Sequence, residues 1–208
     1  MRTLFWSNLE TIGYLKKELR AGEVFLVEGD TVLGLLADVS EKGVAQLDHI
    51  KGRSKKPYLI LVGSKEKALR FIEKSSIDKI QTEKLMNACW PGPVTLIFQA
   101  KKMLDPHIKS SNGTIALRIP DHAGLLRLLE NFNGLFSTSA NSAGAPVPTT
   151  IEAVDSSIMC AVSGIVLNEG NEREQIALPS TIIDCTGERL VVVRHGAFDV
   201  SAFVGIMD

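Results

Sequence analysis

The stretch Thr114-Ile115-Ala116-Leu117-Arg118-Ile119-Pro120 predicts a β-strand that carries one charged residue among apolar ones. Asp121 follows directly and is placed to cap a helix. The buried face of that helix is expected to hold Leu125, Leu128, Leu129 and Phe132. A strand that leads into an amphipathic helix is typical of proteins that mix helices with a sheet.

Strands and helices are interleaved along the rest of the chain. Strands are expected at residues 23–27, 57–62, 94–98, 164–167, 181–184 and 190–194, and another begins at Leu135. Helices are expected at residues 8–20 after Ser7, after Ser40, after Ser64, at 77–88 and after Thr150. Residues 28–35 contain two glycines and an Asp-Thr pair, which predict a turn whose backbone closely approaches another group. This order favours an α/β or α+β fold with one mixed sheet.

The composition is that of a globular domain. The chain has 208 residues, of which 45% are hydrophobic and 23% charged, and these values exclude disordered, collagen-like and membrane classes. We expect a single domain over residues 1–208, because no linker or repeat divides the chain. The formal net charge of −1 provides no global attraction for a polyanion. Any contact with phosphate or nucleic acid must therefore come from a local patch.

The sequence predicts a cytoplasmic protein. The first twenty residues lack the apolar segment of a signal peptide, and no apolar run approaches the length of a membrane span. Cys89, Cys160 and Cys185 are an odd number of cysteines with wide spacing, which favours reduced thiols over a disulfide framework. The four histidines lie far apart, so the sequence nominates no metal site.

The densest positive charge lies in Lys51-Gly52-Arg53-Ser54-Lys55-Lys56-Pro57, between a predicted helix and a predicted strand. A lysine ammonium acts as a point charge toward phosphate, an arginine fork holds two phosphate oxygens, and a glycine allows close approach. The segment is therefore a candidate phosphate clamp, and the alternative is a solvated basic loop.

A run of hydroxyl and amide side chains, Ser137-Thr138-Ser139-Ala140-Asn141-Ser142-Ala143-Gly144, follows the strand that begins at Leu135. These groups can bond a sugar, base or phosphate without adding charge, and the alternative is a polar loop that caps itself. No serine lies in a G-x-S-x-G motif, and the chain contains neither G-x-x-x-x-G-K-[ST] nor G-x-G-x-x-G. The sequence thus argues against a serine-hydrolase elbow, a P-loop and a Rossmann fingerprint.

Two arginines, Arg118 and Arg194, interrupt predicted apolar strands. A guanidinium at such a position must face solvent or be paired, because leaving it buried alone would cost several kcal/mol. Its partner is either a structural Asp or Glu, or the carboxylate or phosphate of a ligand.

In their order along the chain, seven short motifs resemble the YrdC-like family. They are D-T-V-x-G-L at 30–35, K-x-R at 51–53, W-P-G-P-V-T at 90–95, A-L-R-I-P-D-H at 116–122, S-T-S-A-N-x-x-G at 137–144, P-S-T at 179–181 and R-x-G-A at 194–197. Each motif is weak alone, and the resemblance as a whole covers about residues 8–199. The chain is similar to the single-domain bacterial members.

The resemblance implies a twisted, largely parallel and mixed sheet with flanking helices around a positively charged cavity. The best-known members of the family are L-threonylcarbamoyladenylate synthases. These nucleotidyltransferases condense L-threonine, bicarbonate and ATP to threonylcarbamoyl-AMP and pyrophosphate. A separate transferase complex then uses the product for threonylcarbamoyladenosine modification of tRNA next to the anticodon.

The resemblance also implies roles for individual residues. Catalysis is expected to depend on Lys51 and Arg53. ATP is expected to be bound by Lys51, Arg53, Lys55, Lys56, Thr114, Ser139, Asn141 and Arg194. L-Threonine is expected to be bound by Thr31, Arg118, Thr138 and Ser180, with Arg118 facing its carboxylate. Mg²⁺ is expected to accompany ATP, and no carboxylate cluster nominates a protein ligand for it.

Several positions depart from the family pattern. Glu28-Gly29 stands where the family usually has Pro-Thr, Leu33 where it has an aromatic residue, Leu61 where some members have a histidine, and Lys56 where many have an asparagine. Two alternatives therefore stay open. One is a paralogue that forms a carbamoyl-adenylate from another amine or from carbamoyl phosphate. The other is a module that binds double-stranded RNA or tRNA, weakly at this net charge and with steep salt dependence.

Overall fold

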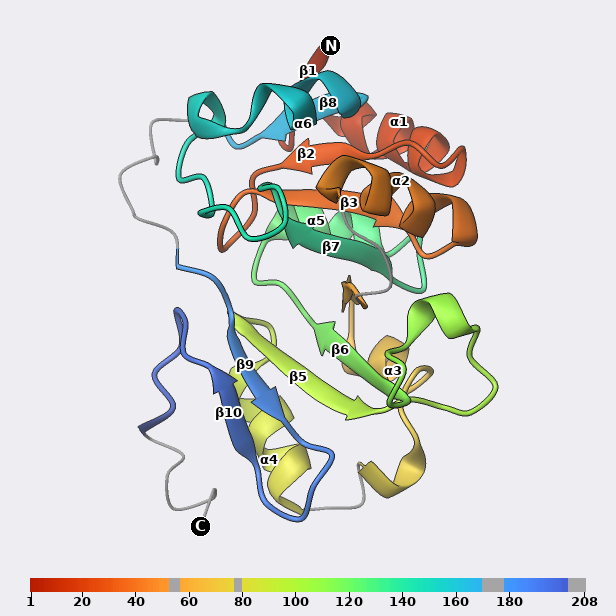
Figure 1. Ribbon diagram of the computed structural model, residues 1–208, viewed down its shortest axis with the longest axis vertical. Coiled ribbons are helices and arrows are strands. Elements are labelled where there is room, and N and C mark those ends of the chain that lie inside the picture. The colour runs from red at the N-terminus through yellow and green to blue at the C-terminus, as the bar shows by residue number, and fades with distance from the viewer. Residues whose placement is uncertain (53–56, 77–79, 170–177, 202–208) are drawn as a thin grey trace.

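A computed structural model describes residues 1–52, 57–76, 80–169 and 178–201 as one ten-stranded sheet with helices on both faces (Figure 1). The strands are β1 (Arg2–Phe5), β2 (Phe25–Val27), β3 (Gly34–Asp38), β4 (Leu59–Leu61), β5 (Val94–Gln99), β6 (Thr114–Arg118), β7 (Leu135–Ser139), β8 (Gly164–Leu167), β9 (Thr181–Asp184) and β10 (Val191–Arg194). The helices are α1 (Leu9–Arg20), α2 (Glu41–Lys51), α3 (Lys65–Ala68), α4 (Ile80–Cys89), α5 (Ala123–Leu129) and α6 (Ser156–Ala161), with short 3-10 helices η1 (Lys74–Ser76), η2 (Pro106–Ile108) and η3 (Ile151–Ala153). This architecture confirms the predicted fold class.

The strand order is β1-β8-β2-β3-β7-β4-β6-β5-β9-β10. Four of the neighbouring pairs are parallel and five are antiparallel. The described sheet is therefore mixed, as predicted, but parallel pairs do not predominate in it. The reason lies in the connections, because β2–β3, β5–β6 and β9–β10 are consecutive neighbours, and strands joined without a crossover run antiparallel.

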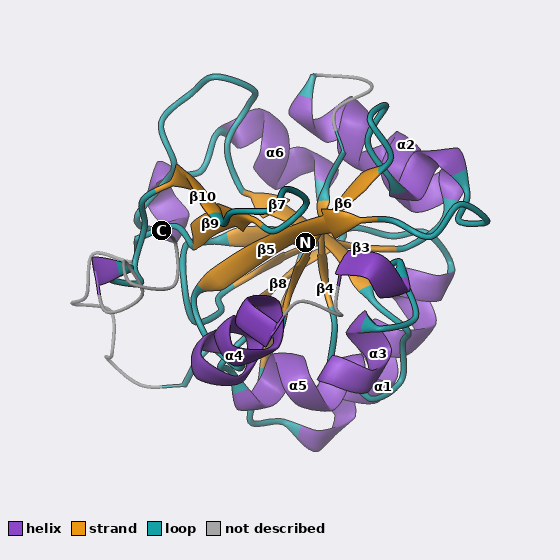
Figure 2. Ribbon diagram, turned by 90° about the horizontal axis from the view of Figure 1, so that it is seen from below, coloured by secondary structure: helices purple, strands orange, loops and turns teal. Residues whose placement is uncertain are grey.

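The helices form a layer on each face of the sheet (Figure 2). Helices α1 and α5 contact each other on one face, and α2 and α6 contact each other on the other. The first layer buries Leu15 and Leu19 of α1 against Phe25 and Leu128, and the second buries Leu47 in the larger core. Within the described ranges, no helix is long and apolar enough to cross a membrane.

Two of the predicted helix caps are confirmed, and two are displaced by one residue. The side chains of Ser40 and Ser64 accept hydrogen bonds from backbone N–H groups at the starts of α2 and α3. Helix α1 is capped by Asn8 instead of Ser7, since the Asn8 amide oxygen accepts the N–H of Glu10. The predicted end of this helix is correct, and its last turn is followed by a residue in the left-handed region, at Gly22.

The cap of α5 is also displaced by one residue. His122 Nδ1 accepts the N–H of Leu125 at 3.1 Å and thus caps the helix in place of Asp121. The backbone N–H of Asp121 instead donates to Asp30 Oδ2 at 2.8 Å, which fastens this corner to the 28–33 loop. After Thr150 the chain forms only the short helix η3 before α6 begins.

Strands β1 and β3 are not predicted by the sequence. Strand β1 is short and exposed except at Leu4, so it shows no long apolar run. Strand β3 begins at Gly34, inside the predicted turn of residues 28–35, so the turn ends two residues earlier than predicted. Leu9, at helical spacing with the buried leucines of α1, is 81% exposed because it is the first residue of the helix.

Two glycines provide a matched test of this packing. A Cβ at Gly124 would lie 2.6 Å from the Trp6 ring, whereas a Cβ at Gly13 in α1 meets nothing within 4 Å. We expect Gly124→Ala to destabilise the fold by about 1–3 kcal/mol through overpacking. Gly13→Ala should stabilise it by about 0.5–1 kcal/mol, because alanine loses less backbone entropy in a helix. Urea unfolding measures both, and equal free energies of unfolding for the two variants would contradict the packing of α5 on Trp6.

Candidate functional site

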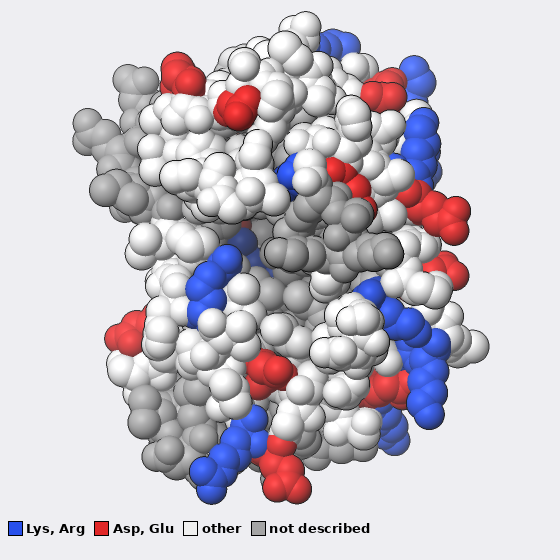
Figure 3. Space-filling view, in the orientation of Figure 1, with Lys and Arg blue, Asp and Glu red and all other residues white. Residues whose placement is uncertain are grey.

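The predicted site residues that the structure describes lie mainly at the ends of strands and of helix α2, and in the loops next to them. Strands β2, β3 and β7 form the upper part of the molecule in Figure 1, and β5, β6, β9 and β10 form the lower part. Figure 3 shows that this face is hollowed between the two parts, with lysine or arginine atoms at the rim and inside the hollow. Two groups of polar contacts surround the arginines Arg118 and Arg194. A third group surrounds the buried Lys51.

The third group joins the two polar runs of the sequence. Lys51, at the end of α2, is 3% exposed, and its Nζ donates to the carbonyl oxygen of Ser139 at 2.6 Å and to Asn141 Oδ1 at 3.1 Å. Ser139 Oγ donates to the same Oδ1 at 2.5 Å, and Asn141 Nδ2 donates to the carbonyl of Ala145 at 2.5 Å. Lys51 thus forms one cluster with Ser139 and Asn141, which lie 88 and 90 positions further along the chain.

Three other members of the predicted phosphate clamp, Arg53, Lys55 and Lys56, lie outside the described residues. Gly52, the residue after Lys51, caps α2 with φ of 59°, in the left-handed region. Glycine adopts this conformation without steric penalty, which ends the helix immediately after Lys51.

Thr114 and Thr138 are placed apart from these contacts. Thr114 begins β6, about 13 Å along the strand from Arg118 at a rise of about 3.3 Å per residue, and its hydroxyl contacts Ser110 Oγ at 2.7 Å. Thr138 lies in β7 opposite Leu35 of β3. Among the residues that the structure describes, neither side chain bonds another predicted site residue.

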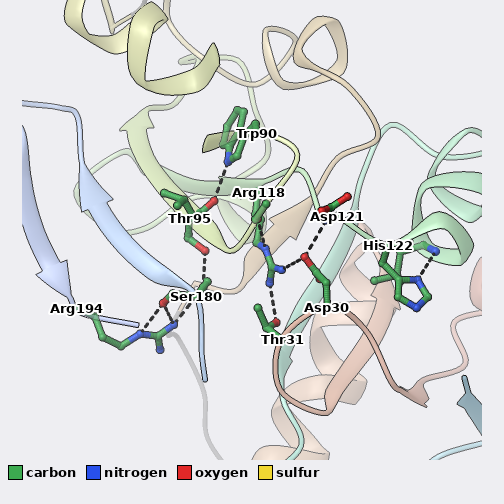
Figure 4. Close-up of polar contacts among 12 residues, drawn as sticks. Asp30, Thr31, Trp90, Thr95, Arg118, Asp121, His122, Ser180 and Arg194 are labelled. Carbon is green, nitrogen blue, oxygen red and sulfur yellow. Dashed lines mark hydrogen bonds and ion pairs between the residues drawn. The ribbon is translucent and has the colours of Figure 1, made fainter. Parts of the chain in front are cut away.

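Arg118 ends β6 and is the most strongly held side chain of the site (Figure 4). It is 4% exposed. Its Nε donates to the carbonyl of Gly92 at 2.9 Å, and its Nη1 donates to Thr31 Oγ1 at 2.8 Å. Its Nη2 lies 2.5 Å from Asp30 Oδ2 in an ion pair. One guanidinium therefore ties β6 to the 28–33 loop and to the turn at 90–93.

Asp30 is the site residue that sequence reasoning missed. Burial lowers the pKa of Arg118, and the Asp30 carboxylate opposes that shift by stabilising the charged guanidinium. A usable signal was present, since a buried arginine needs a carboxylate, and Asp30 directly precedes the predicted site residue Thr31. Of the two partners expected for a strand arginine, a structural carboxylate is the one found at Arg118.

Arg194, at the end of β10, has a different kind of partner. Its Nε and Nη2 donate to the carbonyl of Ser180 at 3.1 and 2.7 Å, and Nη2 also lies 3.2 Å from Ser180 Oγ. Ser180 Oγ in turn lies 2.8 Å from Thr95 Oγ1 of β5 (Figure 4). Burial lowers the pKa of Arg194, and the positive charge of Arg118 lowers it further. The charge of one guanidinium therefore disfavours the charge of the other, and an anion bound close to both would relieve this repulsion.

The chain after β10 is fixed against the start of β9. Thr181 Oγ1 accepts the N–H groups of Gly196 and Phe198, both at 3.1 Å, and donates to the carbonyl of Phe198 at 2.9 Å. A Cβ at Gly196 would lie 2.1 Å from the carbonyl oxygen of Pro179. The glycine after Arg194 is thus required for the two segments to pack closely.

Two of the positions that depart from the family pattern have structural roles. Glu28 Oε2 accepts the backbone N–H of Asn168 at 2.7 Å, and the Glu28 carbonyl accepts Trp6 Nε1 at 2.8 Å. Leu33 is buried in the core, and its carbonyl accepts the N–H of Ala140 at 2.9 Å. These residues hold the ends of the 28–33 loop, so the loop is anchored on both sides of Asp30 and Thr31.

The described residues contain no group of three or more His, Cys, Asp or Glu side chains arranged to hold a metal ion. The polar groups described at the site are hydroxyls, amides and cations, which bind anions and neutral polar ligands, together with the Asp30 carboxylate that is paired with Arg118.

The ion pair of Arg118 can be tested by a substitution that removes the carboxylate charge and keeps the shape of the side chain. We expect Asp30→Asn to destabilise the fold by about 3–5 kcal/mol, because it leaves a buried guanidinium uncompensated. Asp121→Asn is the matched control, since it removes a neighbouring carboxylate that is exposed and should cost under about 0.5 kcal/mol. Chemical unfolding of both variants measures the difference, and equal losses would show that the ion pair has no special role.

Two curated proteins named threonylcarbamoyl-AMP synthase are similar to this chain. The protein from Vibrio vulnificus (strain YJ016) is 30% identical over 188 residues, which cover 89% of this chain and 97% of that protein. The protein from Bacillus subtilis (strain 168) is 31% identical over 193 residues, which cover 90% of this chain and 54% of that protein.

A solved structure supports the same relationship. The crystal structure of Pyrococcus abyssi Sua5 complexed with L-threonine has a TM-score of 0.85 and 25% identity, and covers 99% of this chain. This chain spans 60% of that Sua5 chain. The family profile Sua5_yciO_yrdC, described as "Telomere recombination", matches residues 17–196. With the fold, the ordered motifs and these matches in agreement, the chain belongs to the Sua5/YciO/YrdC family.

Proposed function

We propose that this protein is an L-threonylcarbamoyladenylate synthase, which condenses L-threonine, bicarbonate and ATP to threonylcarbamoyl-AMP and pyrophosphate. Relatives named for this product are 30% and 31% identical over most of the chain, and the Sua5 neighbour was solved with L-threonine. The observation that carries the proposal is one group of polar contacts that contains Arg118 and Arg194, each bonded to a hydroxyl side chain (Figure 4). Two nearby cations with hydroxyl groups suit substrates that bring a carboxylate and phosphates.

The reaction requires positioning and charge neutralisation more than covalent help from the protein. The amine of threonine adds to bicarbonate with loss of water, or to carbon dioxide with loss of a proton, and forms a carbamate. A carbamate oxygen then attacks the α-phosphorus of ATP, and pyrophosphate leaves. In the transition state, negative charge builds up on the departing pyrophosphate, so fixed cations beside it lower the barrier. A nucleophilic side chain is not needed.

On the ATP side, Lys51 and Arg53 are the proposed catalytic residues, supported by Lys55 or Lys56. The Lys51 ammonium is held by two neutral oxygens, those of Ser139 and Asn141, so these contacts orient it without cancelling its charge. Ser139, Asn141, Thr114 and Arg194 are proposed to bind the nucleotide. Arg194 is suited to this role because the oxygen atoms that hold it also carry no formal charge.

On the amino-acid side, Arg118 is proposed to bind the carboxylate of L-threonine, with Thr31, Thr138 and Ser180 close to the substrate. Asp30 and Gly92 restrain the guanidinium, so it meets the carboxylate in one orientation. Such preorganisation lowers the entropy that the substrate must lose on binding. The neighbouring Arg194 keeps the pocket positive although Asp30 is present.

Mg²⁺ is proposed to enter with ATP, bridging its phosphates and neutralising part of their charge. The product is an activated carbamoyl donor and is proposed to be used by a separate transferase complex that modifies an adenosine of tRNA next to the anticodon. Relatives named for the same product support the identity of the product itself.

The activity is tested by pyrophosphate release from the purified protein with ATP, Mg²⁺, bicarbonate and L-threonine. We expect release that stops when either threonine or bicarbonate is omitted, because both must form the carbamate before the α-phosphorus is attacked. Release with another amine or with carbamoyl phosphate, but not with threonine, would identify the paralogue instead. Binding of tRNA without any pyrophosphate release would favour the RNA-binding alternative.

The phosphate clamp is tested by Lys51→Ala and Arg53→Ala. Each should lower the rate of adenylate formation at least tenfold, or about 1.4 kcal/mol of transition-state stabilisation. The Lys51 variant should stay folded, because its lost hydrogen bonds are worth about 1–3 kcal/mol against a total stability of about 5–15 kcal/mol. Lys42→Ala is the control, since Lys42 is an exposed lysine on the same helix. Wild-type rates from both folded clamp variants would refute this assignment.

A further inference from the structure

The buried hydroxyl of Thr95 on β5 contacts Ser180, a residue of the proposed amino-acid pocket. Thr95 is 2% exposed, and its Oγ1 lies 2.8 Å from Oγ of Ser180, a residue that is itself only 5% exposed. Arg194 contacts the same Ser180 hydroxyl from the other side (Figure 4). Three side chains from β5, β10 and the segment before β9 therefore form one line of polar contacts.

The chemistry of the groups sets the direction of these hydrogen bonds. A guanidinium can only donate, so Ser180 Oγ accepts from Arg194 Nη2. A hydroxyl can accept two hydrogen bonds and donate one. If Thr95 donates to Ser180, both acceptor positions of Ser180 Oγ are filled, and its own hydrogen remains for a third group. If Ser180 donates to Thr95, the Thr95 hydrogen needs another acceptor.

The proposed pocket decides between the two directions. Within the described part of the chain, Ser180 is the hydrogen-bond partner of the Thr95 hydroxyl, and no second acceptor contacts it. In either direction one buried O–H lacks a protein acceptor, and only that of Ser180, at the proposed amino-acid pocket, can find one on a bound substrate, so the arrangement in which Thr95 donates is preferred. Ser180 is then obliged to donate its hydrogen away from both neighbours.

We infer that Thr95 is a positioning residue that makes the Ser180 hydroxyl a hydrogen-bond donor toward the substrate. This inference rests on the proposed function, in which Ser180 lies close to the amino acid. A donor hydroxyl beside Arg118 and Arg194 favours an oxyanion, which here is the carboxylate of the amino acid, over an ammonium or amide donor. Thr95 thus acts on specificity without touching the substrate.

The experiment compares four variants at the two threonines. Thr95→Val and Thr95→Ala remove the hydroxyl, and the alanine avoids crowding Ser180 if the valine does not fold. Thr95→Ser retains the hydroxyl. Thr82→Val is the matched control, because Thr82 is a fully buried threonine of α4 whose hydroxyl has no partner within the described residues. The readouts are KM for threonine, KM for ATP, kcat, and the shift in Tm that threonine produces.

We expect the variants without the Thr95 hydroxyl to raise KM for threonine about tenfold and to reduce the threonine-induced Tm shift. KM for ATP should stay within about twofold, because Arg194 keeps its two bonds to the Ser180 carbonyl. Thr95→Ser and Thr82→Val should resemble the wild type. In a Ser180→Ala background, Thr95→Ala should add nothing further, because the residue acts through Ser180.

Two results would overturn the inference while leaving the proposed function intact. One is an unchanged KM for threonine in folded Thr95→Ala protein, and the other is an equal rise in KM for threonine and for ATP. If the wild type itself shows neither a threonine-induced Tm shift nor threonine-dependent pyrophosphate release, the proposed function fails first. The inference fails with it.

Discussion

The buried ion pair between Arg118 and Asp30 is the interaction on which the arrangement of the site depends. Arg118 ends a strand in the interior of the sheet, where an unpaired charge could not be tolerated. Asp30 supplies the opposite charge, and the N–H of Asp121 holds the same carboxylate oxygen. The pair therefore specifies where the 28–33 loop must lie, and Thr31 is brought to the guanidinium as a consequence. The main contribution of the ion pair is to position the 28–33 loop, since forming a buried pair adds little net stability to the fold.

The strand order explains how residues far apart in sequence meet. Strand β7 lies between β3 and β4, so the loop after it reaches the end of α2, where Lys51 binds Ser139 and Asn141. Strand β5 lies between β6 and β9, so Thr95 reaches Ser180 across 85 positions. The proposed ATP side and the proposed amino-acid side therefore share elements of one sheet, since Arg194 binds Ser180 and Thr138 directly precedes Ser139 in β7.

Much of this could be predicted from local sequence, and the exceptions have physical causes. Helix α2, with its cap at Ser40, and strands such as β5 and β6 follow from periodicity and capping. The wrong cap at α5 arises because the Asp121 N–H is bound by Asp30, a contact 91 positions away that no local pattern reports. Strand β3 begins at a glycine and is fixed by its pairing with β7. The sequence indicates that Arg118 needs a partner if it is buried, but which carboxylate supplies it depends on how distant segments meet, so Asp30 was missed.

The distribution of partners, more than net charge, makes this an anion site. The chain carries a net charge of −1, yet Arg194 is held by oxygens of Ser180 and the described contacts of Lys51 are with neutral oxygens. Only Arg118 has a carboxylate among these contacts. Neutral acceptors orient a cation without cancelling its field, whereas an ion pair cancels much of it. Positive potential is therefore retained where phosphates are proposed to bind. It is reduced at Arg118, because the ion pair with Asp30 offsets part of the guanidinium charge while holding the group in one orientation.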